Sequence, residues 1–252
     1  MKSHVKRNAM LAVAALLFAA ESLTSPLAAQ TPHPTSLDPA VLPSRDEHQG
    51  VLIAADPYLT SARSKKRFGK KHPYAAGILA VEVYVRNDTD REINLSPSAI
   101  ELRVAPPGAP PQQIQALTSL ETAARIIDPG VYNPNEWPPW WVPSVCPDAG
   151  NCPPRDPEAR FKKKLKAVKK LDRAIAPQCL IDSVGPHSTI HGLLFFDMGG
   201  QFQLTAESRI YFPKIRLSKP KQDMIFFDVS LQPAVKLAKH DRGVARMDSQ
   251  DE

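Results

Sequence analysis

The residues with the most distinctive chemistry in this chain are three cysteines and two closely spaced histidines. His187 and His191 are four positions apart, which is the spacing of two metal ligands on one face of a helix. They fall at the entrance of an apolar stretch typical of a strand, where same-face positions four apart lie about 13 Å from each other. Three cysteines at these spacings match no standard zinc pattern either. We therefore expect no metal site and no cofactor.

A disulfide is the chemistry that the cysteines favour. Cys146 and Cys152 flank a five-residue loop, and in an oxidising compartment they are expected to form a disulfide. Cys179 is then left over. Pairing of Cys179 with either of the other two cysteines, or with a second chain, stays open.

A proline-stiffened loop carries every tryptophan of the chain, Trp137, Trp140 and Trp141. Aromatic rings on such a loop offer a large contact area at low entropic cost, so they could stack on sugar rings or grip a partner. The alternative is that they fold back as a lid over the protein core, since tryptophans are usually substantially buried.

A basic amphipathic helix is predicted over 157–175, where Pro157 suits the first helical position. Apolar residues recur at helical spacing at Phe161, Leu165, Val168, Leu171 and Ile175. Lysines occupy most of the other positions, and we take Lys162, Lys166 and Lys169 as candidate contacts for an anionic partner. The alternative is a surface helix that packs by its apolar stripe and leaves its lysines in solvent.

Alternation of apolar and polar residues predicts β-strands in two parts of the chain. The clearest covers 79–86, and others follow at 100–104, 190–197, 204–212 and 225–231. Gly199-Gly200 is predicted to be the turn of a hairpin. We expect one core to contain the inward-facing residues of these strands: Val81, Val83, Ile100, Leu102, Phe196, Ile210, Phe227 and Val229.

The stretch between these two groups of strands contains one further predicted helix. Thr118-Ser119-Leu120-Glu121 fits a capping box, which would open a helix that ends at about Ile127. We interpret this helix as structural.

The N-terminus predicts export. Basic residues precede an apolar run over 9–20, and the small residues Ala28 and Ala29 follow, which is the pattern of a secretory signal peptide over 1–29. The run is shorter than the roughly 20 apolar residues of a transmembrane helix. We expect a periplasmic or extracellular protein with no transmembrane segment after cleavage, whose formal net charge falls from +6 to +4.

The remaining length suits one domain. We expect an extended segment over 30–49 and a β-domain over 50–235. An insertion at about 105–183 interrupts this domain and is far longer than a usual loop. The polar tail over 236–252 is predicted to be disordered.

Two separated regions, 50–104 and 184–232, resemble the telokin-like, immunoglobulin-fold domains of bacterial secreted proteins and lipoproteins. The resemblance lies in the alternating strand that ends in Arg86-Asn87-Asp88-Thr89-Asp90, in Ile100-Glu101-Leu102, and in Val184-Gly185-Pro186 leading to Gly192-Leu193-Leu194-Phe195-Phe196. It implies an extracytoplasmic binding or accessory module with no catalytic residues to carry over. This chain departs from the pattern by its insertion and by having no lipoprotein cysteine.

These observations predict an all-β fold, an immunoglobulin-like antiparallel β-sandwich with a long, partly helical, Pro/Trp-rich insertion. No serine, histidine and acid combination or phosphate-binding loop has a recognisable context. We therefore expect a secreted, non-enzymatic module that acts by interaction, with an envelope protein, a cell-wall polymer or an anionic surface as partner and no nucleic acid. The alternative is an envelope hydrolase or glycan-processing enzyme with its site in the insertion. Asn87-Asp88-Thr89 also matches a glycosylation acceptor.

Overall fold

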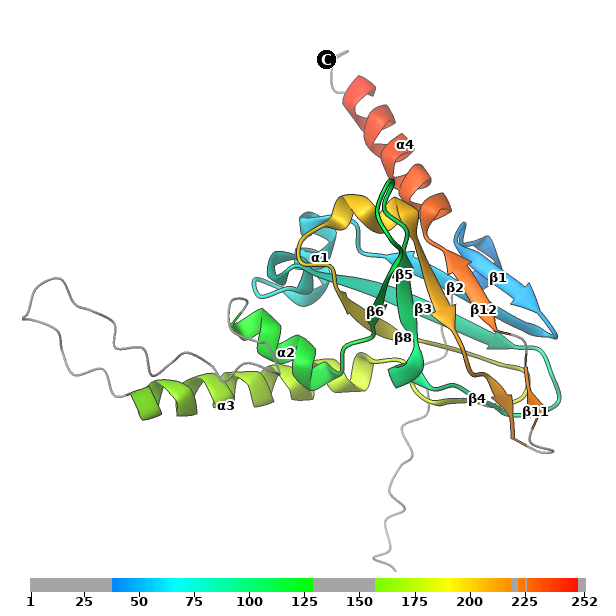
Figure 1. Ribbon diagram of the computed structural model, residues 1–252, viewed down its shortest axis with the longest axis horizontal. Helices are drawn as coiled ribbons and strands as arrows, with labels where there is room; N and C mark the ends of the chain where they lie inside the picture. The colour runs from blue at the N-terminus through cyan, green and yellow to red at the C-terminus, as the bar shows by residue number, and fades with distance from the viewer. Residues whose placement is uncertain (1–37, 129–156, 219–221, 225, 249–252) are drawn as a thin grey trace, which may run out of the picture. The chain divides into compact units, whose positions relative to one another are not determined.

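The computed structural model describes residues 38–128, 157–218, 222–224 and 226–248, and Figure 1 shows the ribbon. These residues form three antiparallel four-stranded sheets. The first sheet has the order β1-β2-β3-β8, with strands Arg45–His48, Val51–Pro57, Ile78–Asn87 and Ser188–Asp197. The second has the order β12-β9-β5-β6, with strands Phe227–Ser230, Ser208–Phe212, Glu101–Val104 and Gln112–Gln115. The third has the order β11-β10-β4-β7, with strands Gln222–Asp223, Arg216–Leu217, Ile93–Asn94 and Ser183–Val184.

Four α-helices accompany the sheets in the described part of the chain: α1 Ser61–Phe68, α2 Ser119–Ile127, α3 Pro157–Ile175 and α4 Gln232–Asp248. The bounds of α2 and α3 confirm the two predicted helices. The capping box at the start of α2 is formed, because the Thr118 side chain accepts from the Glu121 amide and Glu121 accepts in return from the Thr118 amide. Short 3-10 turns lie at Pro39–Val41, Pro73–Ala76, Pro97–Ala99, Ala176–Gln178 and Phe202–Glu207.

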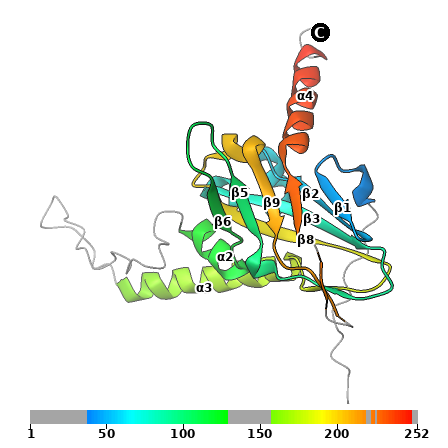
Figure 2. The ribbon, with the colours of Figure 1, turned by 45° about the vertical axis from the view of Figure 1, so that its right-hand side comes forward.

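One apolar core lies between the first sheet and the other two (Figure 2). The first sheet contributes residues such as Val81, Val83 and Phe196, and the second contributes Ile210 and Phe227. Every residue of the predicted core belongs to this cluster, and all of them are fully or almost fully buried. The prediction of a single core from the period-two pattern is therefore confirmed.

The first sheet has a second face, which points away from this core and which we call the outer face. The outer face is also buried over most of its length. β3 and β8 pair over ten residues in register from Ile78↔Asp197 to Asn87↔Ser188. On the outer face a second apolar cluster contains Ile78 and Phe195 together with Ile126 of α2 and Ile175 of α3. The helices are therefore the cover of a sheet that is apolar on both sides, as strands buried on both faces are.

Asn87 ends β3 in a hydrogen-bond network and is fully buried. Its Nδ2 donates to the carbonyls of Arg91, Val184 and Gly185, at 2.7, 3.2 and 2.8 Å. Its Oδ1 accepts from the amide and the hydroxyl of Thr89, at 3.1 and 2.7 Å. These contacts tie β3 to β7, so this asparagine is a structural residue and not a glycan acceptor.

Several predictions on the fold are wrong in part. The three antiparallel sheets confirm a β-rich fold, but the four α-helices go beyond an all-β architecture. Gly199-Gly200 does not turn a hairpin, because β8 and β9 belong to different sheets and the chain crosses the core between them. Strand β6, which lies in the predicted insertion at about 105–183, pairs with β5 in the second sheet.

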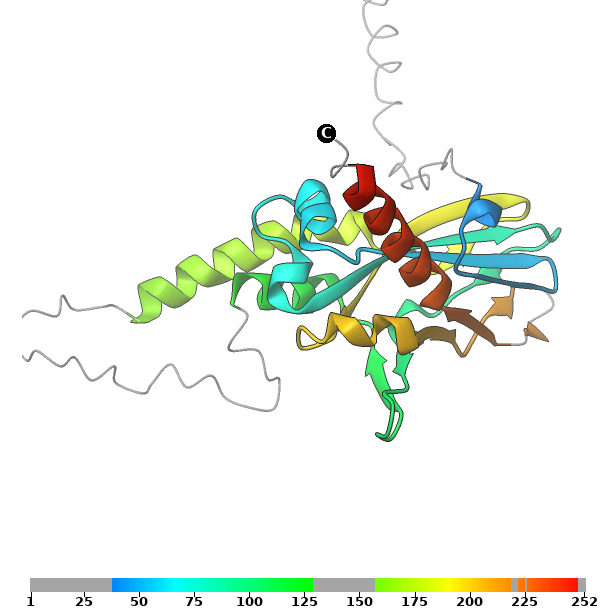
Figure 3. The ribbon, with the colours of Figure 1, turned by 90° about the horizontal axis from the view of Figure 1, so that it is seen from above.

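The chain end also differs from its prediction, because helix α4 covers most of the segment expected to be a disordered tail from residue 236 (Figure 3). The helix starts where Ala234 and Val235 pack against the protein, both less than a tenth exposed. Burial of these residues fixes the first turn, from which the helix propagates. The predicted signal peptide lies outside the described residues.

Replacement of Phe227 by Ala should lower the free energy of unfolding by about 3–5 kcal/mol, because the ring is fully buried in the core and its removal leaves a cavity. The neighbouring Phe226 is 51% exposed and provides a matched control, whose replacement by Ala should cost under about 1 kcal/mol. Chemical denaturation measures both. Equal effects of the two substitutions would contradict the inward orientation of Phe227.

Candidate functional site

Helix α3 is attached to the outer face of the first sheet by its C-terminal half. Ile175 is buried in the second apolar cluster and Leu171 packs against it. α2 lies beside α3, and the Ser119 hydroxyl donates to the Asp172 carboxylate at 2.6 Å. Lys164 forms an ion pair with Asp128 at the end of α2. One side of the helix is therefore held by apolar packing and by polar contacts with α2.

The chain that leaves α3 runs directly over β8 at a glycine. A β-carbon on Gly192 would lie 2.4 Å from Leu180 Cα and 2.5 Å from Leu180 N, closer than any real contact. The Leu180 amide donates to the Leu193 carbonyl at 3.1 Å, which holds this crossing in place. Gly192 thus permits the close backbone approach that fixes the C-terminal end of α3.

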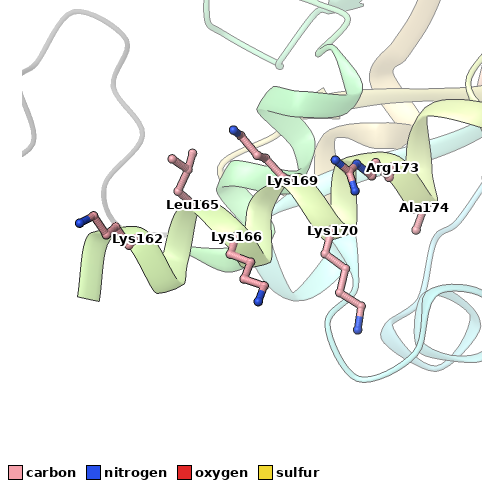
Figure 4. A pocket seen from close by; sticks show the side chains of 7 residues that line it. All are labelled: Lys162, Leu165, Lys166, Lys169, Lys170, Arg173 and Ala174. Atoms are coloured by element: carbon pink, nitrogen blue, oxygen red, sulfur yellow. The ribbon is translucent and has the colours of Figure 1, made fainter. Parts of the chain in front are cut away.

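The opposite side of α3 presents a row of cations, which we call the α3 basic face: Lys162, Lys166, Lys169, Lys170 and Arg173. Their spacing of i, i+4, i+7, i+8 and i+11 places them on one side of a helix. They are exposed and, together with Leu165 and Ala174, line a shallow open depression along the helix (Figure 4). The row is about 17 Å long from the helical rise of its eleven residue steps.

The α3 basic face has little local charge compensation. In the described ranges, Lys166, Lys169, Lys170 and Arg173 form no ion pair. Asp128 at the end of α2 pairs with Lys164, whereas Asp172 of α3 accepts a hydrogen bond from the Ser119 hydroxyl and keeps its negative charge. Helix α3 therefore carries an excess of positive charge toward solvent.

A second group of titratable side chains lies in the middle of the outer face of the first sheet. Glu82 accepts hydrogen bonds from the Tyr58 hydroxyl at 3.1 Å and from His191 Nδ1 at 3.0 Å. The His191 ring stacks on Tyr84, with centroids 5.6 Å apart. Next to them Arg63 Nη1 donates to Asp56 Oδ1 at 2.8 Å, and the second guanidinium nitrogen binds the other oxygen. We call Asp56, Tyr58, Arg63, Glu82, Tyr84 and His191 the sheet polar cluster.

The sheet polar cluster lies between two apolar clusters on the outer face of the first sheet. One cover is the second apolar cluster beneath the helices, and the other is formed by Leu52, Ala54 and Tyr84 beneath Ala40 and Leu42. A glutamate that orients a histidine is an arrangement found at catalytic sites. Among the described residues, however, no Ser, Thr or Cys side chain is hydrogen-bonded to His191, so the group has no nucleophile aligned with it.

Burial and nearby negative charge raise the pKa values of the two tyrosines in this cluster. Burial, and after it the charge of Glu82 and the hydrogen bond to Glu82, together raise the pKa of Tyr58 to about 12. Burial and then the charges of Glu82 and Asp56 raise the pKa of Tyr84 to about 12. Both folded-state values exceed the ordinary value of 10.0. The neutral tyrosines therefore stabilise the fold below about pH 10, and this contribution is lost as the pH rises toward 12.

The structure separates the residues that the sequence singled out. Lys162, Lys166 and Lys169 lie together on the α3 basic face, as the sequence predicted. The sequence prediction did not include Lys170 and Arg173 among the candidate contacts, although their helical spacing places them on the same face. His187 binds Asp90 at 2.8 Å and His191 binds Glu82, so the two histidines do not share a site. The described residues contain no group of three or more His, Cys, Asp or Glu side chains that could hold a metal ion.

Other predicted residues cannot be placed. Trp137, Trp140, Trp141, Cys146 and Cys152 lie outside the described residues, so the tryptophan loop and the disulfide stay predictions. Cys179 is a free thiol, and burial, with the nearby charge of Asp172, raises its pKa to about 11. No helix within the described ranges has the length and apolar character needed to cross a membrane.

No family model matches the chain, and no curated protein matches it. Among solved structures, it is similar to a functionally unknown protein from Listeria monocytogenes EGD-e, with 10% sequence identity and a TM-score of 0.29. That match covers 74% of this chain and 79% of the other.

Replacement of Gly192 by Ala should weaken the attachment of α3, because the new methyl group meets the backbone of Leu180. We expect a loss of about 1–3 kcal/mol, as for other overpacked sites, and faster amide hydrogen exchange over 171–180 than in the wild type. Gly185→Ala is the control, since the nearest atom to its β-carbon would be the Ser188 hydroxyl at 3.4 Å. Unchanged exchange over 171–180 in Gly192→Ala would contradict this role.

Replacement of Glu82 by Gln should lower the pKa of Tyr58 and Tyr84, because a negative charge beside both hydroxyls is removed. Their pKa values should stay above 10, since burial is the larger cause. Ultraviolet titration of tyrosinate, with Tyr58→Phe and Tyr84→Phe to assign the signals, measures the effect. Glu101→Gln on the second sheet is the control. An unchanged tyrosine titration in Glu82→Gln would show that Glu82 is not charged beside these rings.

Proposed function

We propose that this protein is an exported, non-enzymatic binding module that holds an acidic polymer of the cell envelope on the α3 basic face. The observation that carries the proposal is the orientation of α3. The C-terminal part of its apolar stripe, Leu171 and Ile175, attaches the helix, so that Lys166, Lys169, Lys170 and Arg173 face solvent. A linear polyanion complements such a row of charges.

An acidic polymer is favoured over a membrane surface. Amphipathic helices that bind bilayers bury their apolar face in the acyl region. In α3 the residues that would do so, Leu171 and Ile175, already pack on the first sheet. Phe161 and Leu165 in the N-terminal half of α3 are 56% and 40% exposed, and these two side chains lie beside five cations. Charge therefore dominates this surface.

The proposal extends to the fold and the location. Three antiparallel sheets around one core, with chain crossings between sheets after β3 and after β8, are compatible with an immunoglobulin-like β-sandwich. In that reading, the segment between β6 and β7 is an insertion that supplies α2 and α3. The N-terminal pattern of basic, apolar and small residues supports export to the periplasm or beyond, where acidic envelope polymers are found.

The triple substitution Lys166, Lys169 and Lys170→Gln tests the proposal. Each lysine near an anionic surface contributes about 1 kcal/mol, so the variant should bind a polyanion about two orders of magnitude more weakly. Binding of wild type to inorganic polyphosphate, measured by calorimetry, should also weaken steeply with salt, since the Debye length contracts from about 10 Å at 0.1 M to about 3 Å at 1 M. The thermal midpoint should be unchanged, because exposed lysines contribute little to stability.

A matched control removes three exposed lysines from elsewhere, with Lys214, Lys236 and Lys239→Gln. This variant has the same net charge as the test variant and should keep most of the affinity. Equal losses in the two variants would contradict a site on α3 and indicate an effect of net charge alone. Absence of polyphosphate binding by the wild type at low salt would reject the proposed function, and binding to phosphatidylglycerol vesicles alone would favour a membrane partner.

A further inference from the structure

Helix α1 and the turn after it carry a second group of exposed cations, which we call the α1 basic arm: Lys65, Lys66, Arg67, Lys70 and Lys71. The helix is capped at its start by Thr60, whose side chain accepts from the Arg63 amide, and at its end by Gly69, which has a φ of 83°. Three of the cations lie in its last turn, where the negative end of the helix dipole favours them. Within the described ranges none of the five forms an ion pair.

The α1 basic arm is fixed relative to α3 through a shared apolar cluster. Phe68 at the end of α1 contacts the rings of Tyr58 and Phe195, with centroids 5.6 and 6.2 Å away. Leu171 of α3 packs against the same cluster, which also contains Ile175. α1 and the C-terminal end of α3 lie on the same side of the first sheet (Figure 3). Two sets of lysines therefore border one rigid patch.

The carboxylates near these two sets of cations are already bound by other partners. Asp56 is engaged by Arg63, and Asp197 by Arg125. Asp128 binds Lys164, and Glu121 accepts from Thr118 at the start of α2. Three of these carboxylates, Asp56, Asp197 and Asp128, are thus neutralised by ion pairs with Arg63, Arg125 and Lys164.

We propose that the α1 basic arm and the α3 basic face bind one continuous polyanion chain, so that the partner is a polymer long enough to span both. This inference rests on the proposed function of α3. Two binding elements on one rigid body convert the second contact into an intramolecular one, so a chain that reaches both gains affinity over a chain that reaches one. The structure therefore predicts selection of the partner by length.

The experiment compares two probes and four proteins. The short probe is inorganic polyphosphate that covers only the α3 basic face of about 17 Å, and the long probe is polyphosphate several times that length. The proteins are the wild type, the α1 variant Lys65, Lys66 and Lys70→Gln, the α3 variant Lys166, Lys169 and Lys170→Gln, and the control variant Lys214, Lys236 and Lys239→Gln. All three variants change the net charge equally, and unfolding midpoints confirm that each is folded.

The readout is the ratio of long-chain to short-chain affinity, expressed per chain. We expect the wild type and the control variant to prefer the long chain at least about tenfold, and the α1 variant to lose that preference while it keeps short-chain binding. If the α1 variant keeps the full preference, the inference is wrong and the proposed function stands. If the wild type binds neither chain at low salt, both fail.

Discussion

The pairing of β3 with β8 is the constraint on which the rest of this structure depends. Ten residues pair in register, and both faces of the pair carry large apolar side chains. One face is buried by the other two sheets, but the other face needs a cover that the strands themselves do not supply. Helices α1, α2 and α3 provide it. The direction in which α3 presents its lysines follows from this requirement, because the apolar stripe must face the sheet.

The two covers of the outer face do not meet, and the sheet polar cluster occupies the gap. Unpaired carboxylates there would be costly, since polar groups at low exposure need partners. Asp56 and Glu82 are cross-strand neighbours, and two negative charges placed opposite each other repel. Arg63 neutralises the first, while Tyr58 and His191 donate to the second. The cluster is best understood as the means by which a band of the sheet stays stable without an apolar cover.

Short sequence patterns correctly predicted the features that depend on neighbouring residues in the chain. Alternation placed Val81, Phe196 and Phe227 in the core, and the capping box located the start of α2 at Thr118. Features set by distant contacts were missed. Gly199-Gly200 looks like a hairpin turn, but β9 pairs with β5 and β12 rather than with β8. The tail is helical because its first turn packs on the protein, which composition does not reveal. The role of Asn87 depends on carbonyls almost one hundred residues away in the chain.

Many of the arginines in the described part of the chain pair with carboxylates, on the helices as well as on the sheets, as Arg63 pairs with Asp56 and Arg125 with Asp197. On the sheets, Arg86 pairs with Asp38 and Asp88, and Arg216 pairs with Asp223. Lys166, Lys169 and Lys170 of α3 and the lysines of the α1 basic arm are exposed to solvent. The planar guanidinium group of arginine binds a carboxylate in a fixed geometry, whereas the ammonium group of lysine is a strongly hydrated point charge on a flexible side chain. Mobile charges recognise the density of negative charge along a partner and not the shape of one group. This difference in chemistry is the reason why we propose a repetitive acidic chain as the ligand of these surfaces.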